Sequence, residues 1–491
     1  MQNPDFTAHM NWIEREHAFP SDPAQFHAKR FEYMLTHSPL EAKLRSIPGI
    51  VGAGSCGKAS TLSFSARIFS ALGLKCAVGV KPPLSESPLG NLERYQIWEG
   101  TDRGRRMTPQ EFETLFPALL RAAAMTELKH PEWGAAAPYD MRAFLLDSFA
   151  VSQQADLLIS EANIGRRRDP ISCLPNTVMT LVAPIGTDHG GLLTAPEGFH
   201  PELGPKAGPY YDKADGLQAG REAVFGRQDE RVQQLIDQDS IRQGRDYQAI
   251  DCRCSMDGSA FQLQINRELA GWLQINAAAF RERVFRLQAL GKFQCENAAQ
   301  ALIGALTLRR RALNILNNPG DSLNDFASSR LVKTLQTLSL DDFLQAAERG
   351  LGAAQVPGRL QLIAPDCVEA VASSPEKLQA LLDSLAALVK PGQKVCVGAT
   401  FLDRIHYLRQ AVEMLAEWPL NAYMAVTKYL DDEVNRDAAP ADLAACCPRA
   451  QLCASPAEAR QLVLERARRN GDIALFLGNG MLSFLHRQPQ E

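Results

Sequence analysis

The stretch VGAGSCGKASTLSF, residues 51–64, carries the pattern on which the predicted fold depends. Glycine lets a loop curl so that its amide groups face an anion, and Gly52, Gly54 and Gly57 are spaced for that purpose. Lys58 is expected at the start of a helix, where its charge adds to the partial positive charge of the helix N-terminus. Taken alone, such a loop is about equally compatible with an ordinary turn between a strand and a helix.

Ala59 follows the lysine, at the position where the simplest phosphate-loop pattern has serine or threonine. That hydroxyl normally helps to hold Mg²⁺, and alanine has none. Ser60 and Thr61 come next in the chain. We therefore expect Ser60 to supply the hydroxyl.

The segments around this loop predict a βαβ unit. The apolar run IPGIV precedes the loop, Leu62, Ala66 and Phe69 then recur at helical spacing, and LKCAVGV is typical of a strand. The pattern returns at residues 141–162 and at TVMTLVAPIG, and it restarts from about residue 356. We therefore expect an α/β protein with a large domain over residues 1–355 and a smaller Rossmann-like domain over residues 356–491.

Other segments give local expectations. Residues 8–46 are amphipathic and predict helices, residues 195–220 are rich in glycine and proline and predict a long loop, and residues 257–275 alternate as a hairpin or a small antiparallel sheet does. Ser339, Ser374 and Ser455 stand where helix N-caps are expected.

Composition narrows the functional classes. The net charge of −4 argues against a nucleic-acid binder, which normally carries a basic excess. No apolar run approaches the roughly 20 residues that cross a bilayer, and the first residues lack the pattern of a secretory signal. The 11 cysteines have no zinc-ribbon spacing, which favours reduced thiols. We expect a cytoplasmic protein that binds small molecules and no membrane.

Three side chains near strand ends are candidate metal ligands: Glu161 in DLLISEA, and Asp188 and His189 in APIGTDH. Taken singly, each is more often a carboxylate held by a helix N-terminus or a hydrogen-bonded loop histidine. The carboxyl ends of parallel strands meet at one edge of a sheet, where such folds bind their ligands. Together with Ser60, they favour a site for one or two Mg²⁺ ions.

Several motifs together resemble the Mur ligase superfamily, and most closely folylpolyglutamate synthase/dihydrofolate synthase. That family carries its loop as G-T-N-G-K-G-S, beside GSCGKAS here, so a small residue after the lysine has a precedent. SEANIGRRRDPIS resembles E-V-G-L-G-G-R-L-D-A-T-N, and APIGTDH resembles S-I-G-L-D-H. LGKFQCENAAQAL, PGRLQLI and GATFLDR resemble three later segments, and the likeness spans nearly the whole chain.

The resemblance implies roles for individual residues. GPKAGP resembles E-K-A-G-I, whose lysine is carbamylated in the family, which makes Lys206 its counterpart; spacing alone favours an ordinary loop lysine. Asn297 is implied to contact ATP, Arg359 to reach its phosphates, and Asp403 to bind the nucleotide. Glu161, His189 and Ser60 are the implied Mg²⁺ ligands. The loop is implied to bind the nucleotide through six residues: Gly54, Ser55, Gly57, Lys58, Ser60 and Thr61.

Two segments depart from the family pattern. L-D-G-A-H-N-P, which contacts the nucleotide from the second domain, is EAVASSP here, and T-S-P-H-L, which contacts the substrate, is VKPPL. The acceptor is therefore expected to differ from a pterin or to be held differently.

The resemblance implies an ATP-dependent ligase that joins an amino acid or amine to a carboxylate acceptor through an acyl phosphate. Lys58, Lys206, His189 and Arg359 are its implied catalytic residues. Two alternatives stay open: a catalytically degenerate homologue that binds nucleotide or acts as a scaffold, and an NTPase that couples hydrolysis to motion.

Overall fold

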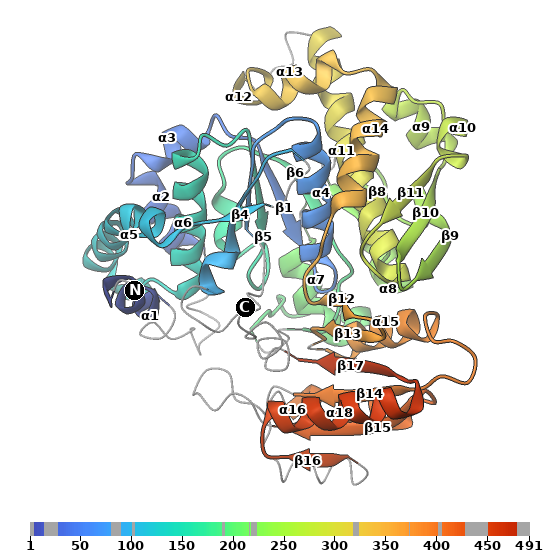
Figure 1. Cartoon of the computed structure of the whole chain (residues 1–491). Coiled ribbons are helices and arrows are strands. Elements are labelled where there is room, and N and C mark those ends of the chain that lie inside the picture. Colours follow the sequence, from blue (N-terminus) through green and yellow to red (C-terminus); the bar gives the residue numbers. More distant parts are fainter. Residues whose placement is uncertain are drawn as a thin grey trace.

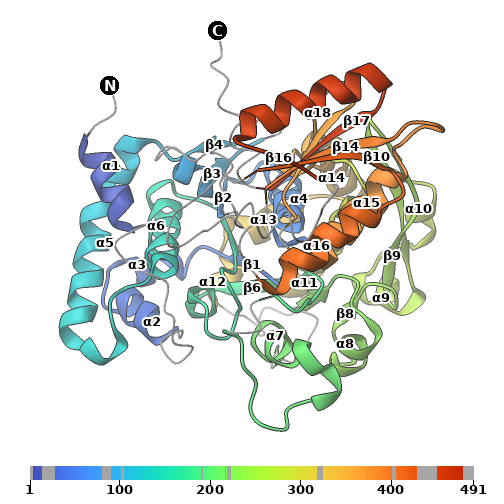
Figure 2. The ribbon, with the colours of Figure 1, turned by 90° about the horizontal axis from the view of Figure 1, so that it is seen from below.

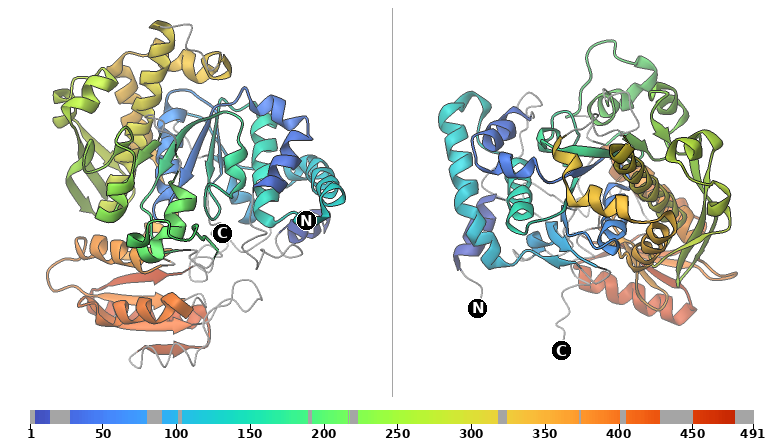
Figure 3. Two further views of the ribbon diagram at one scale, coloured as in Figure 1. Left: turned by 180° about the vertical axis from the view of Figure 1, so that it is seen from behind. Right: turned by 90° about the horizontal axis from the view of Figure 1, so that it is seen from above.

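The computed structural model describes residues 4–13, 28–79, 90–100, 104–188, 192–215, 217, 223–317, 324–372, 374–400, 405–427 and 450–478. These residues form an eight-stranded, a three-stranded and a six-stranded sheet (Figure 1). The six-stranded sheet lies at one end of the molecule, in the views from the front and from behind (Figure 3). No helix among the described residues is both long and apolar enough to cross a membrane.

The strand that precedes the glycine-rich stretch is central in the eight-stranded sheet, whose order is β4-β3-β2-β5-β1-β6-β7-β8. β1 pairs in parallel with both β5 and β6, and only β3 and β4 run antiparallel to their neighbours. The strands are β1 (Gly49–Ala53), β2 (Cys76–Gly79), β3 (Tyr95–Trp98), β4 (Arg105–Arg106), β5 (Leu157–Glu161), β6 (Thr177–Val182), β7 (Ala223–Phe225) and β8 (Ile241–Arg242). The carboxyl ends of β1, β5 and β6 therefore meet at one edge.

Helices cover both faces of this sheet because successive residues of its strands point to opposite sides. Ile50 packs into the apolar core under α4, α11 and α14, whereas Val51 packs into the core under α2, α3, α5 and α6. The first layer is α4 (Lys58–Ala71), α11 (Lys292–Asn317) and α14 (Leu340–Ala353). The second layer is α2 (Lys29–Thr36), α3 (Leu40–Leu44), α5 (Pro109–Lys129) and α6 (Pro138–Ser152).

The three-stranded sheet, of order β11-β10-β9, is antiparallel and packs against α11. Its strands are β9 (Tyr247–Ser255), β10 (Gly258–Ile265) and β11 (Val284–Leu287). The remaining helices of the large domain are α1 (Pro4–Asn11), α7 (Ala207–Lys213), α8 (Glu230–Leu235), α9 (Arg267–Leu273), α10 (Ala278–Arg281), α12 (Asn324–Ala327) and α13 (Arg330–Thr337). Short 3₁₀ turns span Gly90–Arg94, Pro131–Trp133, Pro170–Cys173 and Pro201–Lys206.

The six-stranded sheet has the order β12-β13-β17-β14-β15-β16, with only β12 antiparallel to its neighbour. α15 and α16 cover one face and α18 covers the other (Figure 2). The strands are β12 (Arg359–Ala364), β13 (Cys367–Ala370), β14 (Val395–Ala399), β15 (Asn421–Thr427), β16 (Gln451–Cys453) and β17 (Ile473–Leu477). The helices are α15 (Pro375–Ala386), α16 (Ile405–Glu417) and α18 (Pro456–Asn470).

The structure confirms the predicted βαβ unit as β1, α4 and β2. Ser339 and Ser455 cap their helices, accepting hydrogen bonds from the amides of Asp342 and Glu458. Ser374 is the N-cap residue of α15, but its side chain makes no capping bond to the helix.

One prediction of local structure was wrong. The segment expected as a loop over residues 195–220 contains α7, because Tyr210 packs against Leu203 and Phe225 in an apolar cluster of its own. The alternating segment expected in a hairpin or small antiparallel sheet forms β10 of the three-stranded antiparallel sheet, but it ends at Ile265, since Asn266 caps α9 by accepting from the amide of Leu269. The amphipathic segment 8–46 forms the end of α1 together with α2 and α3, with residues 14–27 outside the described part.

A buried ion pair joins α2 to α6. Arg30 Nε lies 2.6 Å from Asp140 Oδ2, and the two side chains are 1% and 0% exposed. Arg30 also donates to the Trp133 carbonyl at 2.8 Å, and Asp140 accepts from the amide of Ala137 at 3.0 Å. Burial raises the pKa of Asp140 to about 6, against the opposing effect of Arg30.

We expect Arg30→Met to destabilise the protein by about 3–5 kcal/mol, because Asp140 then remains buried without its cation. Arg30→Met combined with Asp140→Leu should recover most of that loss. The control Arg45→Met breaks an exposed pair with Glu41 and should cost about 1 kcal/mol or less. Guanidinium unfolding followed by tryptophan fluorescence measures all three, and equal losses for Arg30→Met and Arg45→Met would contradict the prediction.

Candidate active site

Residues 54–57, here called the glycine loop, leave the carboxyl end of β1 and enter α4. Gly54 and Gly57 have φ angles of +109° and +97°. A Cβ on Gly54 would lie 2.3 Å from the Ala183 carbonyl oxygen, and one on Gly57 would lie 2.5 Å from Asn297 Oδ1. Both positions therefore require glycine, for conformation and for space.

Lys58 is the first residue of α4, and its side chain turns back over the glycine loop. Its Nζ donates to the Gly54 carbonyl at 2.8 Å and lies 3.9 Å from Glu161 Oε1. Both side chains are about one-tenth exposed, at 11% and 9%. The amides of the first turn of α4 have no partners within the helix, so a full charge and a helix N-terminus face the same volume.

The second hydroxyl after Lys58 ties the loop to α11. Thr61 Oγ1 donates to Gln300 Oε1 at 3.3 Å and to Asn297 Oδ1 at 3.5 Å. Asn297 therefore contacts Thr61 and borders the space above Gly57. Ser60 is buried within the same first turn.

Two segments that follow β6 add an acidic group, Asp188, and a basic group, Lys213. Lys213 Nζ, at the end of α7, donates to Asp188 Oδ1 at 2.8 Å and to Ser55 Oγ at 2.9 Å. Ser55 Oγ also accepts from the amide of Gly186 at 2.8 Å. Lys213 is 0% exposed, and burial lowers its pKa to about 8, with Lys58 acting in the same direction and Asp188 against it.

Lys206, the lysine singled out in the sequence, has its ion-pair partner at the start of α8. Its Nζ pairs with Asp229, which also caps α8 by accepting from the amide of Val232 at 3.1 Å. His189 and Asp403 lie outside the described residues.

The C-terminal sheet and its first helix contribute three more charges. Glu376, in the first turn of α15, accepts from Thr187 Oγ1 at 3.1 Å. Burial acts to raise the pKa of Glu376, but hydrogen bonds from its own amide, Ser374 and Thr187 lower it overall. Burial lowers the pKa of Lys377, and Cys56, Lys58 and Arg359 are among its charged or titratable neighbours.

Arg359 begins β12 and lies near Glu161. Burial lowers the pKa of Arg359, against the effect of Glu161. The first turn of α11 holds this position, because Gln294 Nε2 donates to the Arg359 carbonyl at 3.2 Å. Four basic residues therefore gather around the glycine loop from three separate parts of the chain: Lys58, Lys213, Arg359 and Lys377.

The donors present fit Mg²⁺. Within the described residues, no group of three or more His, Cys, Asp or Glu is placed to hold a metal ion. Mg²⁺ does not need such a cage, because it commonly takes one or two carboxylates and completes its shell with water and substrate phosphates. Glu161 and the buried hydroxyl residue Ser60 are hard oxygen donors of that kind at the glycine loop.

Comparison with solved structures identifies the architecture. Folylpolyglutamate synthase of Mycobacterium tuberculosis complexed with ADP superposes with a TM-score of 0.70 at 17% identity, covering 99% of this chain and 100% of that one. The chain has the folylpolyglutamate synthase fold. The apo form of the Lactobacillus casei synthase gives a TM-score of 0.70 at 16% identity, covering 98% of each chain. The same values hold for a synthase complex with AMPPCP and folate.

Sequence comparison alone gives no such result. No protein-family model matches the chain, and no curated protein matches it either. The resemblance predicted from short motifs is thus confirmed at the level of the fold.

The sequence analysis missed Lys213, Glu376 and Lys377. A signal for Lys213 was present, since an acid precedes the lysine in E-K-A-G-I and Asp212 precedes Lys213, whereas Pro205 precedes Lys206. Asp212 is 0% exposed and accepts from the amide of Arg166 at 2.8 Å, which fixes the end of α7. Lys377 gave no signal of its own, because its role depends on how α15 meets the large domain.

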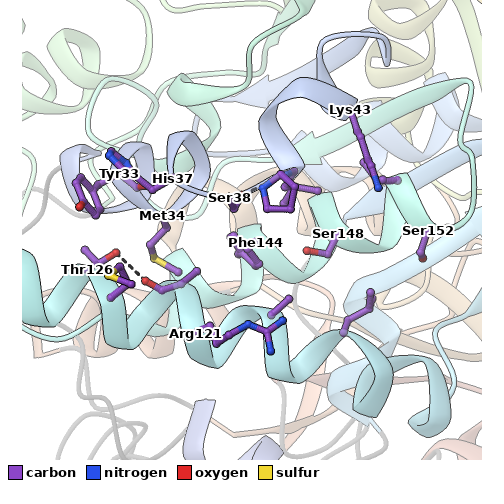
Figure 4. A pocket seen from close by; sticks show the side chains of 17 residues that line it. Tyr33, Met34, His37, Ser38, Lys43, Arg121, Thr126, Phe144, Ser148 and Ser152 are labelled. Atoms are coloured by element: carbon purple, nitrogen blue, oxygen red, sulfur yellow. Dashed lines mark hydrogen bonds between the residues drawn. The ribbon is translucent and has the colours of Figure 1, made fainter.

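Two cavities border α6. One of about 30 Å³ is bordered by Glu161 and by two cations, Arg94 and Arg142. The other, of about 450 Å³, lies between α2, α3, α5 and α6, with Lys43 and Arg121 on opposite sides of an apolar floor (Figure 4). Only the first adjoins a residue of the glycine-loop site.

We expect Gly57→Ala to lower the affinity for AMPPCP at least tenfold, about 1.4 kcal/mol. The substitution adds a Cβ where Asn297 lies, in a conformation that disfavours alanine. The matched control is Gly73→Ala, whose φ is +83° but whose Cβ would meet nothing within 4 Å. Calorimetric titration should find the control within about twofold of wild type; equal weakening in both variants would mean that only backbone strain matters.

Proposed function

We propose that this protein is an ATP-dependent ligase that forms an amide bond between a carboxylate acceptor and an amino acid or amine. In this proposal the glycine loop acts as a phosphate loop, residues 1–355 form the ATP-binding domain, and residues 356–491 form a Rossmann-like domain. The observation that carries the proposal is the gathering of Lys58, Lys213, Arg359 and Lys377 around that loop.

Charge explains why such a reaction needs this cluster. Two like unit charges 4 Å apart repel by about 4 kcal/mol at the effective dielectric constant of a protein surface, and ATP and a carboxylate bring several such charges together. Lys58 and Lys377 are placed to neutralise phosphate oxygens, and Arg359 approaches from the side of Glu161. ADP and AMPPCP are bound in the solved synthases of the same fold, which supports ATP as the cosubstrate.

The proposed reaction has two steps, phosphoryl transfer and then amide formation. A carboxylate oxygen of the acceptor attacks the γ-phosphorus of ATP, forming an O–P bond while the bond to the ADP oxygen breaks. The amine nitrogen then attacks the acyl carbon, phosphate leaves with the C–O bond electrons, and the nitrogen loses a proton to solvent. Arg359 and Lys377 belong to the C-terminal unit, so the site is complete only when both units meet, which also excludes water from the acyl phosphate.

Mg²⁺ would be held by Ser60 and Glu161, with His189 as a further predicted ligand, and would neutralise charge on the transferring phosphoryl group. Lys58 binds and orients the phosphates beside it, because its Nζ reaches both the loop carbonyl and Glu161.

We place the carboxylate of the acceptor at the small cavity beside Glu161. Arg94 and Arg142 border it, and arginine is suited to bind a carboxylate through two parallel hydrogen bonds. A synthase of the same fold is solved with folate bound, which supports a small organic acid as the class of acceptor. We place the protein in the cytoplasm, where ATP is present and thiols stay reduced.

Lys213, rather than Lys206, is the lysine that we propose to be carbamylated. The neutral amine attacks CO₂ to give a carbamate and a proton, and a pKa of about 8 leaves an appreciable neutral fraction near neutral pH. The carbamate would place an anionic oxygen pair beside Ser55 and Asp188. Lys206 is instead ion-paired with Asp229.

This assignment predicts a carbamate carbon signal in ¹³C NMR of the protein equilibrated with ¹³C-bicarbonate. The signal should vanish in Lys213→Met and persist in Lys206→Met. The opposite pattern would return the role to Lys206, and a signal that survives both changes would place the carbamate elsewhere.

Magnesium-dependent phosphate release, with product mass as a second readout, tests the ligase itself. Pools of amino acids and small carboxylic acids are supplied, and turnover should require one member of each class. Lys58→Ala and Lys377→Met should each lower turnover by about 10²–10³-fold, because each removes a charge aimed at the phosphates. Lys390→Ala, an exposed lysine on the same unit as Lys377, is the control and should retain full activity.

Two outcomes would overturn the proposal. Nucleotide binding without turnover, even with cell extract as the source of acceptors, would favour the catalytically degenerate homologue, which the comparisons do not support. Phosphate release that needs neither acid nor amine would favour an NTPase.

A further inference from the structure

Three cysteines meet where the three-stranded sheet touches α11. Cys252 and Cys254 lie two residues apart on β9, and Cys295 is in the first turns of α11. The Cys295 thiol donates to the carbonyl of Ala260, the neighbour of Ser259 on β10, at 3.8 Å, and Cys252 and Cys254 are its titratable neighbours. Cys295 is 0% exposed, while Cys252 and Cys254 are half-buried.

Cys254 lies in surroundings that stabilise a thiolate. Ser259, its cross-strand partner, donates through Oγ to Cys254 Sγ at 3.6 Å and accepts from the Gly291 amide at 3.1 Å. Gly291 immediately precedes α11, so Cys254 faces the positive end of a 26-residue helix, with Lys292 beside it. The Cys295 thiol lowers the pKa of Cys254 most; burial opposes it, and Ser259, Gly291 and Lys292 assist, giving about 6.

The trio is not arranged as a metal centre. Across the described part of the chain, no three cysteines, histidines or acids are positioned to hold an ion. The neighbouring thiols Cys252 and Cys254, and then burial, raise the pKa of Cys295, which keeps it protonated near Cys254. A half-buried thiolate near a buried thiol is the arrangement in which a nucleophile and a resolving cysteine form a disulfide.

We propose that Cys254 and Cys295 form an oxidation-sensitive dithiol in which Cys254 is the nucleophile and Cys295 resolves it. The oxidant is a hydroperoxide. The Cys254 sulfur attacks one peroxide oxygen, the O–O bond breaks, and water leaves after protonation, giving a sulfenic acid. The Cys295 sulfur then attacks that sulfur, the S–O bond breaks, and a second water leaves, so that two thiols and one H₂O₂ give one disulfide and two waters.

The dithiol is joined to the glycine loop through the first turns of α11. Asn297, two residues after Cys295, contacts Thr61 and the space above Gly57, and Gln294 contacts the Arg359 carbonyl. Cys254 also packs against the core of the C-terminal unit. A disulfide that shifts this turn would displace Asn297 and lower the affinity for ATP, a consequence that rests on the proposed function.

The first test is chemical and does not depend on ATP. Reduced full-length protein is alkylated at pH 6, where a thiol of pKa about 6 should react roughly tenfold faster than one of ordinary pKa, after allowing for its lower nucleophilicity. Cys173 is the internal control, because it is also half-buried but burial raises its pKa to about 12. Peptide mass spectrometry after stoichiometric H₂O₂ should then show a Cys254–Cys295 link.

Variants assign the roles. Cys295→Ser should leave Cys254 as a sulfenic acid that a dimedone probe captures, Cys254→Ser should abolish both products, and Cys173→Ser should change neither. Cys254 reacting no faster than Cys173, or a Cys252–Cys295 link with Cys254 still reduced, would overturn the assignment.

The coupling is tested by AMPPCP titration of reduced and oxidised protein. We expect affinity to fall about tenfold on oxidation, within the usual range for coupled sites, and not to change in Cys254→Ser. A disulfide that forms without any change in affinity would overturn the coupling alone. Reduced protein that does not bind AMPPCP would instead refute the proposed function, and the mass data would still decide the dithiol.

Discussion

The close approach of backbone to backbone at the end of β1 is the constraint on which the rest of the structure depends. Gly54 lies against the Ala183 carbonyl, so a side chain there would push away the backbone that follows β6, and a side chain at Gly57 would have to displace the Asn297 side chain. The central position of β1, between two parallel neighbours, fixes both of those contacts. Because the sheet, α4 and α11 all meet at the same few atoms, a polyanion bound there would touch elements from the whole large domain.

The same convergence makes the site electrostatically costly. Lys213 and Lys377 both have lowered pKa values, chiefly because burial disfavours their charged forms, and Lys58 adds to the effect in each case. Asp188 and Glu161 offset only part of this repulsion. A bound triphosphate would supply negative charge to these cations. Their mutual repulsion in the free protein would then be relieved on binding, which would add to the affinity for the ligand. Such a site is built for an anion larger than one carboxylate.

Sequence patterns predicted the fold and the residues at the ends of β1, β5 and β6, whereas the positions of Lys213 and Lys377 emerge only from the structure, and this difference has a physical cause. β1, α4 and the strand ends bearing Glu161 and Asp188 follow from local periodicity and glycine spacing, which act within about 15 residues. Lys213 and Lys377 owe their positions to tertiary packing. Asp212 fixes the end of α7, and Thr187, after β6, donates a hydrogen bond to Glu376 in the first turn of α15. The match to K-A-G selected Lys206, because Gly208 follows Ala207 whereas Asp215 follows Ala214; the acid before Lys213 and the three-dimensional contacts favour Lys213 instead.

α11 connects features that are distant in the sequence. Its first turns hold Cys295 against the Ala260 carbonyl of β10, Gln294 against Arg359 and Asn297 against Thr61, and Phe293 packs with the core of the six-stranded sheet. A displacement of this turn at any one of these four contacts would shift the other contacts as well, since packed interiors transmit small shifts instead of absorbing them. Phe293 and the first turn of α15 both lie at this junction. The first turns of α11 and α15 therefore bring the glycine loop, the three-stranded sheet and the six-stranded sheet together.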